Sequence, residues 1–252
     1  MKNKSAFFDH RNTIHRVSEE EEIQKHDYLK PIEAFARATN SSVYVIDYMA
    51  QGFEFVSDNP LFLCGNTPIE VLALGYDYYF KYVPPKDLEL LLKINDIGFS
   101  FYEKIPLNDR LNYSISYDFH LKNHLGKILL VNQKLTPLFL TNEGKIWKAI
   151  CIVSVSTERT AGNIKIYKYN ENKVYTYNLS TNVWEIEKKV SLTKREIEIL
   201  QHSIRGLTIT EIAEAIFVSP DTVKFHRKKI FEKLAVTNIT EAIAYATNNG
   251  LF

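Results

Sequence analysis

Five cationic side chains lie within ten consecutive positions near the C-terminal end of the chain: Lys224, Arg227, Lys228, Lys229 and Lys233. Only two acidic residues, at positions 221 and 232, oppose them, so residues 219–234 carry a net charge of +3. Positive charge concentrated on a short segment attracts polyanions, of which nucleic acid is a frequent example. The chemistry that these residues indicate is therefore recognition of a nucleic acid.

The sequence around these cations predicts one helix with two unlike faces. Ser219 can cap its N-terminus, Pro220 suits the first helical position and Asp221 complements the helix dipole. At helical spacing one face consists of Val223, His226, Ile230 and Leu234, and the other of Lys224, Phe225 and Lys228. We expect the apolar face to pack on a small core and the other face to meet the polyanion.

Three more helices are predicted around the basic helix. Residues 193–196 and 208–211 each read Thr-x-x-Glu, a capping box, and Asn238 caps the last helix. Gly206 stands where a helix-ending glycine belongs. The helix expected over residues 209–217 is joined to the basic helix by a tight turn, which predicts a helix-turn-helix. The predicted core residues are Ile197, Leu200, Ile204, Ile212, Ala213, Ile216, Ile239, Ala242, Ile243 and Ala246.

These motifs resemble the DNA-binding domain of LuxR-type regulators, the group that includes NarL and FixJ. The resemblance covers about the last sixty residues and rests on blocks that occur in the same order: Leu192 to Glu196, Glu211 to Ala213, Val218-Ser219, Thr222 to Lys224, His226, Ile230, Lys233-Leu234 and Thr240 to Ala242. Two positions depart from the family pattern, because Thr210 replaces a basic residue and Ala235 replaces a glycine. A basic surface helix in another four-helix domain remains the alternative.

The resemblance implies which residues contact duplex DNA. Lys224, Phe225 and Lys228 match positions that meet bases in the major groove, where the family commonly has valine in place of Phe225. Thr222 and Lys233 match positions that meet phosphates. The full predicted DNA-binding set is Thr208, Ser219, Thr222, Lys224, Phe225, Lys228 and Lys233.

Length and composition set the broader class. The 252 residues leave room for two domains, and 45% hydrophobic with 24% charged residues is typical of a soluble protein. Cys64 and Cys151 form no evident disulfide framework, and the longest apolar run is too short to cross a bilayer. We therefore expect a cytoplasmic, bacterial protein without a membrane partner.

The first part of the chain predicts an α+β fold. Strands are expected over residues 42–49, 53–57, 113–121, 127–140 and 145–156, with short helices and a longer helix, residues 87–97, between the second and third. This order predicts an antiparallel five-stranded sheet with helices on one face. Spaced landmarks also resemble PAS domains: Asn59 to Phe62, Gly65, Thr67 to Glu70 and Pro84 to Asp87. The resemblance implies a cavity between sheet and helices.

The segments that flank this domain are predicted separately. Residues 1–15 are expected to be loose, and the acidic run at residues 19–22 to begin a helix that Pro31 breaks or kinks. Residues 164–188 read as two or three short strands between the domains. Their aromatic residues are expected to pack this small sheet, although a stacking surface for single-stranded nucleic acid is the alternative. Those residues are Tyr167, Tyr169, Tyr175, Tyr177 and Trp184.

Other reactive residues favour structural roles. Asp47 follows an apolar strand, like the phosphate-accepting aspartate of receiver domains, but the strand order argues for a turn residue. His120 and His124 are interpreted as surface residues rather than haem or metal ligands, and Cys64 as a small buried side chain. The sequence predicts no catalytic residue, no metal site and no cofactor, so we do not expect an enzyme.

The sequence as a whole predicts a DNA-binding transcriptional regulator. The predicted parts are an N-terminal helical segment (1–40), a PAS-like sensor domain (41–160), a β meander and linker (161–190), and a LuxR-type helix-turn-helix domain (191–252). The predicted partners are double-stranded DNA, a second copy of the chain and a small organic effector. Two alternatives remain for the first domain: a pure dimerisation or protein-interaction module, or a signal-transducing enzyme that uses the cavity.

Dimerisation is predicted because one domain of this size buries little surface on DNA. Two helices offer apolar stripes for the interface. The last helix carries small residues and a tyrosine at Ala242, Ala244, Tyr245 and Ala246, and the LuxR-type resemblance implies that it pairs. The helix that ends near Thr39 carries Ile32, Phe35 and Ala36. The alternative for both stripes is packing within one chain.

Overall fold

The structure, a computed structural model, describes residues 3–19 and 28–251. The chain divides into two compact units, Met1–Glu187 and Lys188–Phe252. Most of the predicted acidic helix start, residues 20–22, lies outside the described residues. The two units are described in turn.

The first unit is built on an antiparallel sheet whose first five strands match the predicted ones to within two residues at each end. Their bounds are β1 Ser42–Asp47, β2 Gly52–Val56, β3 Tyr113–Lys122, β4 Ile128–Leu140 and β5 Ile146–Val155. They lie in the order β2-β1-β5-β4-β3, so β1 pairs with both β2 and β5 although β5 is far away in sequence. The predicted mixed α and β fold with an antiparallel sheet is confirmed.

Three more strands extend this sheet to eight, where five were predicted. They are β6 Gly162–Lys168, β7 Lys173–Asn178 and β8 Val183–Lys188. β6 pairs directly with β3, with Ile166 opposite Ile115, so the meander continues the sheet of the first domain. Its aromatic residues pack as predicted, since the Trp184 ring lies 5.1 Å from Phe101 and 5.0 Å from Tyr177. Tyr169 is the exception, with 73% of its surface exposed.

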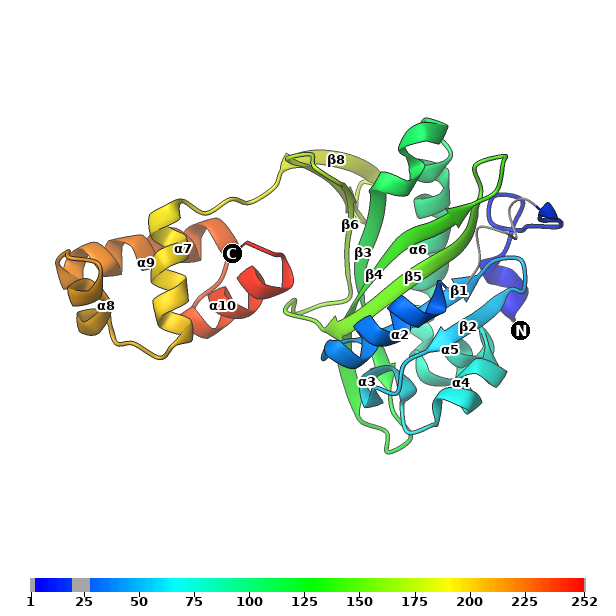
Figure 1. Cartoon of the computed structure of the whole chain (residues 1–252), viewed down its shortest axis with the longest axis horizontal. Helices are drawn as coiled ribbons and strands as arrows, with labels where there is room; N and C mark the ends of the chain where they lie inside the picture. The colour runs from blue at the N-terminus through cyan, green and yellow to red at the C-terminus, as the bar shows by residue number, and fades with distance from the viewer. Residues whose placement is uncertain (1–2, 20–27, 252) are drawn as a thin grey trace. The chain divides into compact units, whose positions relative to one another are not determined.

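Helices cover both faces of the sheet, where the sequence predicted helices on one face only (Figure 1). On one face lie α3 Pro60–Leu63, α4 Pro68–Leu74, α5 Asp77–Tyr82 and α6 Pro85–Tyr102, which share the main core with the sheet. α2 Leu29–Ala38 covers the other face through Ile32, which packs with Val43 and Val45. Pro31 lies in the first turn of α2, where no intrahelical N–H is needed, so it does not break the helix.

The segment formed by residues 3–17 is ordered, contrary to the predicted loose start. It contains the short 3-10 helix η1, Lys4–Phe7, and it packs Phe7 and Ile14 into the main core. Arg11 anchors it to α6 through a 2.7 Å bond to the Asp96 carboxylate, and Asn95 Nδ2 donates to the Phe7 carbonyl at 2.7 Å. The scattered aromatic residues of this polar stretch therefore indicate a segment that packs on the domain. We call residues 3–17 the N-terminal segment.

Asp47 has the structural role that the sequence favoured. One carboxylate oxygen accepts from the backbone N–H groups of Met49 and Ala50 at 2.9 and 3.1 Å, which closes the turn after β1. The other accepts from the Lys148 ammonium at 2.7 Å. Lys148 is fully buried and also contacts Glu54. Its positive charge is therefore compensated by two carboxylates, those of Asp47 and Glu54.

The second unit is a four-helix domain with its own core. Its helices are α7 Lys194–Ile204, α8 Ile209–Ala215, α9 Pro220–Leu234 and α10 Ile239–Asn248. Ten buried apolar side chains from all four helices form the core, including Leu200, Ile212, Ile230 and Ala246. Two predicted core residues lie outside this core: Ile197 is partly exposed and Ile204 is half exposed. Within the described residues, no helix is long and apolar enough to span a lipid bilayer.

Candidate nucleic-acid interface and ligand cavity

A side-chain cap fixes the start of each helix in the second unit. The predicted capping boxes are present at Thr193 and Thr208, where the threonine N–H donates to the glutamate three residues later at 2.7 Å. Ser219 Oγ accepts from the Thr222 N–H at 3.2 Å, and Asn238 caps α10. Each cap satisfies an N–H group that the helix leaves unpaired, so the first residues of α8 and α9 are held in defined positions.

The turn between α8 and α9 contains a strained residue. α8 ends at Ala215, two residues earlier than predicted, and Phe217 adopts a left-handed conformation with φ +56°. Its side chain is 95% exposed, so no burial compensates for the unfavourable backbone. α9 then begins at Pro220 behind its Ser219 cap.

α9 has the two faces that the sequence predicts. Val223, Ile230 and Leu234 are buried in the core of the unit, and His226 is half-buried beside them. The opposite face presents Lys224 and Lys228 together with Phe225, an aromatic side chain that is 56% exposed. The helix therefore combines one anchored face with one cationic face that is open to solvent.

The cations of α9 differ in their partners. Lys224 contacts Asp221 at 3.0 Å and Lys229 contacts Glu232 at 3.1 Å, so each forms a local pair one turn apart. Arg227 lies over the Phe231 ring. Within the described part of the chain, the exposed Lys228 ammonium has no ion-pair partner. Lys228 is thus the cation of this face that is most available to an external anion.

Lys233 is committed to a contact within the unit. Its ammonium donates to Glu196 Oε2 at 2.7 Å, and the same oxygen accepts from the Thr193 N–H. Burial alone would raise the pKa of Glu196, but the hydrogen bonds from Lys233 and Thr193 outweigh it and hold the pKa below its usual value. The hydroxyl groups of Ser219 and Thr222 are likewise engaged with each other at 2.9 Å.

The two departures from the family pattern have visible positions. Thr210 is exposed on the first turn of α8. Ala235 ends α9 in a left-handed conformation with φ +54°, the conformation that a glycine adopts without strain.

The predicted dimer stripes are partly used within the chain. Ala242 and Ala246 are fully buried in the core of their own unit, whereas Ala244 and Tyr245 remain partly exposed. On α2, Ile32 packs against the sheet and Phe35 is 47% exposed.

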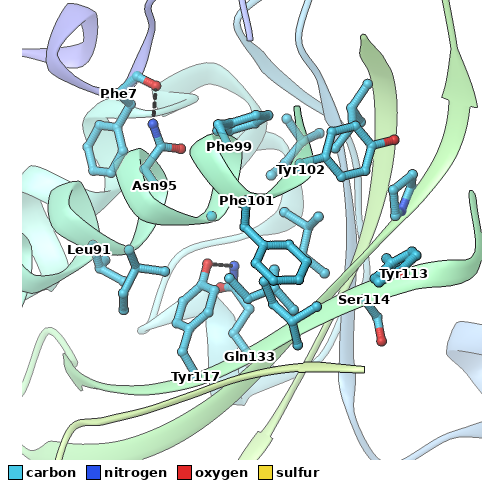
Figure 2. Close-up of a pocket in the computed structure, with 18 of the residues that line it drawn as sticks. Phe7, Leu91, Asn95, Phe99, Phe101, Tyr102, Tyr113, Ser114, Tyr117 and Gln133 are labelled. Carbon is cyan, nitrogen blue, oxygen red and sulfur yellow. Dashed lines mark hydrogen bonds between the residues drawn. The ribbon is translucent and has the colours of Figure 1, made fainter. Parts of the chain in front are cut away.

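A cavity lies between α6 and the sheet in the first unit, where the PAS resemblance implied one. Figure 2 shows Tyr117 and Gln133 joined by a hydrogen bond, Phe101 and Leu91 in the lining, and the carbonyl of Phe7 joined to Asn95 of α6. The sequence did not identify the individual lining residues. The inward positions of β3 and β4 alternate with outward ones, but the facing helix cannot be assigned without the fold.

The remaining reactive residues are held by structural contacts. His120 Nδ1 lies 2.8 Å from the buried Asp87 carboxylate, and His124 Nδ1 lies 3.1 Å from the Cys64 carbonyl oxygen. Burial raises the pKa of the Cys64 thiol and raises that of Cys151 to about 12. Among the described residues, no group of three His, Cys, Asp or Glu side chains is placed to hold a metal ion.

Residues 190–246 match the family described as bacterial regulatory proteins, luxR family. Two curated relatives match stretches of similar length. A transcriptional regulatory protein of Bacillus subtilis, YxjL, is 44% identical over 59 residues, which are 23% of this chain and 27% of that protein. The transcriptional regulatory protein LiaR of the same organism is 48% identical over 61 residues, 24% of this chain and 29% of that protein.

Similarity beyond this domain is remote. A Vibrio cholerae VqmA–ligand–DNA complex aligns over 90% of both chains, at 16% identity and a TM-score of 0.36. The present chain spans only about a quarter of the length of the curated relatives that it matches.

Proposed function

We propose that this chain, whose C-terminal unit is a LuxR-type helix-turn-helix domain, is a transcriptional regulator that binds duplex DNA and responds to a small molecule. The observation that carries the proposal is the outward face of α9. On this face Lys228, for which no ion pair is found among the described residues, lies one turn beyond Lys224, and Phe225 is exposed. A helix anchored on one face and cationic on the other suits insertion into the major groove.

The exposed residues of α9 have chemically distinct roles in this proposal. The ammonium groups of Lys224 and Lys228 donate to guanine O6 and N7, and the Phe225 ring contacts a thymine methyl group. Thr208, Ser219 and Thr222 stand at helix starts, where backbone N–H groups and the dipole attract phosphate. Lys233 adds positive charge near the phosphate backbone of the DNA while its ammonium donates to the Glu196 carboxylate.

We propose that the protein binds as a homodimer to inverted half-sites centred ~10 bp apart. Ala244 on α10 and Phe35 on α2 keep exposed surface for this contact, whereas Ala242, Ala246 and Ile32 are buried and Tyr245 packs partly against the core of the second unit. Footprinting of high-affinity DNA should reveal two inverted half-sites. One unrepeated half-site bound by a single chain would contradict the dimer.

The cavity of the first unit supports the sensing role. It is lined largely by apolar and aromatic side chains with a few polar groups, the usual character of a small-molecule site. An effector regulates only if it favours one arrangement of the protein over another. The competing proposal is that the first unit serves assembly alone, which predicts that no compound in the cavity changes DNA binding.

DNA recognition is tested by enriching tight-binding duplexes from a random pool with the full chain. Affinities for the selected duplex and for random DNA are then compared over a range of salt concentrations. We expect Lys228→Ala to lower discrimination between the two by ~1–3 kcal/mol, because it removes a base contact. Lys127→Ala, an exposed lysine in the first unit, removes the same charge and serves as the control. Failure to enrich any sequence, or equal losses on both DNAs, would contradict the proposal.

A further inference from the structure

The cavity of the first unit has an uncharged wall. Among the described residues that line it there is no Asp, Glu, Lys, Arg or His, and its polar groups are tyrosine, serine, asparagine and glutamine side chains. The Arg110 guanidinium lies over the ring of the lining residue Tyr102, but it donates to the carbonyls of Ile105, Gly144 and Glu103. The Lys168 ammonium lies over the ring of Tyr113, but it pairs with Asp109 and Glu171. A charged molecule would have no counter-charge here, so its burial would be strongly unfavourable.

The size of the cavity limits its occupant. The cavity has a volume of about 90 Å³. An apolar cavity of roughly 150 Å³ binds one benzene ring, so a space of this order suits a molecule with about one ring. A flavin or a haem is much larger than this space.

A directed chain of hydrogen bonds ends inside the cavity. Tyr44 pairs with Tyr79 at 2.6 Å and donates to Gln133 Oε1 at 2.8 Å, and Gln133 Nε2 donates to the Tyr117 oxygen at 2.5 Å. These four residues are at least nine-tenths buried. Since Tyr117 accepts from Gln133, its own O–H is the end of the chain and is available as a donor (Figure 2).

The aromatic side chains favour a flat occupant. Phe7, Tyr76 and Tyr79 form a contiguous cluster in the wall, with ring centroids 5.4–5.6 Å apart. Phe99 and Phe101 contribute two further rings. Faces and edges of rings at such spacings stack well against another ring.

We propose that this cavity binds a neutral one-ring organic molecule that accepts a hydrogen bond from Tyr117. The inference deepens the proposed function, because it names the chemical class of the effector. The occupant is expected to be neutral because the cavity wall carries no charge, and its size follows from the cavity volume. Its hydrogen-bond acceptor follows from the Tyr117 hydroxyl.

The charge and size of the occupant are tested on the full chain with a panel of neutral one-ring compounds, each paired with its carboxylate and ammonium counterparts. Benzamide, benzoate and benzylammonium form one such set, and FMN and haem are included as large ligands. We expect at least one neutral member to bind at least tenfold more tightly than both charged counterparts, by NMR titration. No neutral binder, equal binding of a charged counterpart, or stoichiometric binding of FMN or haem would overturn the proposal.

The hydrogen bond is tested with two ligands of the same shape, acetophenone and α-methylstyrene, of which only the first has an acceptor oxygen. In Tyr117→Phe we expect the affinity for acetophenone, relative to α-methylstyrene, to fall roughly three- to tenfold. Tyr113→Phe, which removes another hydroxyl from the cavity wall, should leave the ratio within twofold. An unchanged ratio in Tyr117→Phe would overturn the assigned contact.

Two further measurements keep the outcome clear. If Tyr117→Phe does not fold, chemical-shift changes in wild-type protein with selectively labelled tyrosine replace it, and we expect the Tyr117 resonances to move most with acetophenone. DNA enrichment is carried out on the same preparation without ligand. Sequence-selective DNA binding without any neutral binder would reject the effector class and leave the DNA-binding role intact, whereas the reverse result would reject only DNA binding.

Discussion

Lys233 on α9 and Glu196 on α7 form a 2.7 Å ion pair that ties the basic helix to the helix that begins the second unit. The carboxylate side chain is only 4% exposed, and it also completes the Thr193 capping box. The pair thus links helix capping, helix packing and the placement of α9.

The first prediction concerns the stability contributed by this pair. We expect Lys233→Ala to lower the free energy of unfolding of the second unit by about 1 kcal/mol, because a buried carboxylate loses a donor while partial exposure of Lys233 limits the effect. Native-state hydrogen exchange of the α7 and α9 core amides measures it. Lys229→Ala, whose pair with Glu232 is exposed, should change exchange little. Equal effects of the two variants would contradict the prediction.

The second prediction follows from the lowered pKa of Glu196. A carboxyl group with a lower pKa in the folded state stabilises the fold above the unfolded pKa of about 4.5, and this contribution disappears as pH falls through the folded value. We therefore expect protection of the α7 amides to fall as the pH drops below the unfolded value of about 4.5. Glu196→Gln should be less stable at pH 7 and show a shallower pH dependence. A variant with the same acid profile as the wild type would argue against this role.

The third prediction concerns the strained turn residue. Phe217→Gly should raise the free energy of unfolding of the second unit by about 0.5–1 kcal/mol, because relief of the left-handed strain exceeds the added entropy of the unfolded chain. Ala235→Gly, at an exposed left-handed position at the end of α9, should also stabilise. Thermal unfolding followed by circular dichroism at 222 nm measures both. A loss of stability in Phe217→Gly would show that the exposed ring makes a stabilising contact.

The fourth prediction concerns the anchor of the N-terminal segment. Arg11 is 12% exposed in its side chain and bonds to Asp9, Asp96 and the Ser100 hydroxyl. Arg11→Ala should therefore speed hydrogen exchange in residues 5–12 severalfold while the strands exchange as before. Arg16→Ala removes an exposed arginine from the same segment and should have little effect. Unchanged exchange in Arg11→Ala would mean that Phe7 alone holds the segment.

Local signals allowed much of the fold to be predicted. Capping boxes at Thr67, Thr193 and Thr208 mark the starts of three helices, and runs of β-branched and aromatic residues between turn residues indicated the strands. The two faces of α9 followed from helical spacing alone. Such features depend on neighbours in sequence, so they can be read without the fold.

Long-range pairing could not be predicted in the same way. The pairing of β6 with β3 joins Ile166 to Ile115, and several registers would have suited the same alternating pattern. The Lys233–Glu196 pair spans 37 positions, and it gave a predicted phosphate-contacting residue a second role. The docked N-terminal segment depends on Asp96 and Asn95 of a distant helix, so composition alone indicated a loose chain.

The core of the second unit is complete within itself, since all of its buried and partly buried apolar members lie between residues 190 and 251. A segment that satisfies its own packing can be joined to a different neighbour without any change to that core. Gene fusion can therefore exchange the first unit while the core of the second unit keeps its stability. The curated relatives fit this view, because their similarity to this chain is confined to about a quarter of their length.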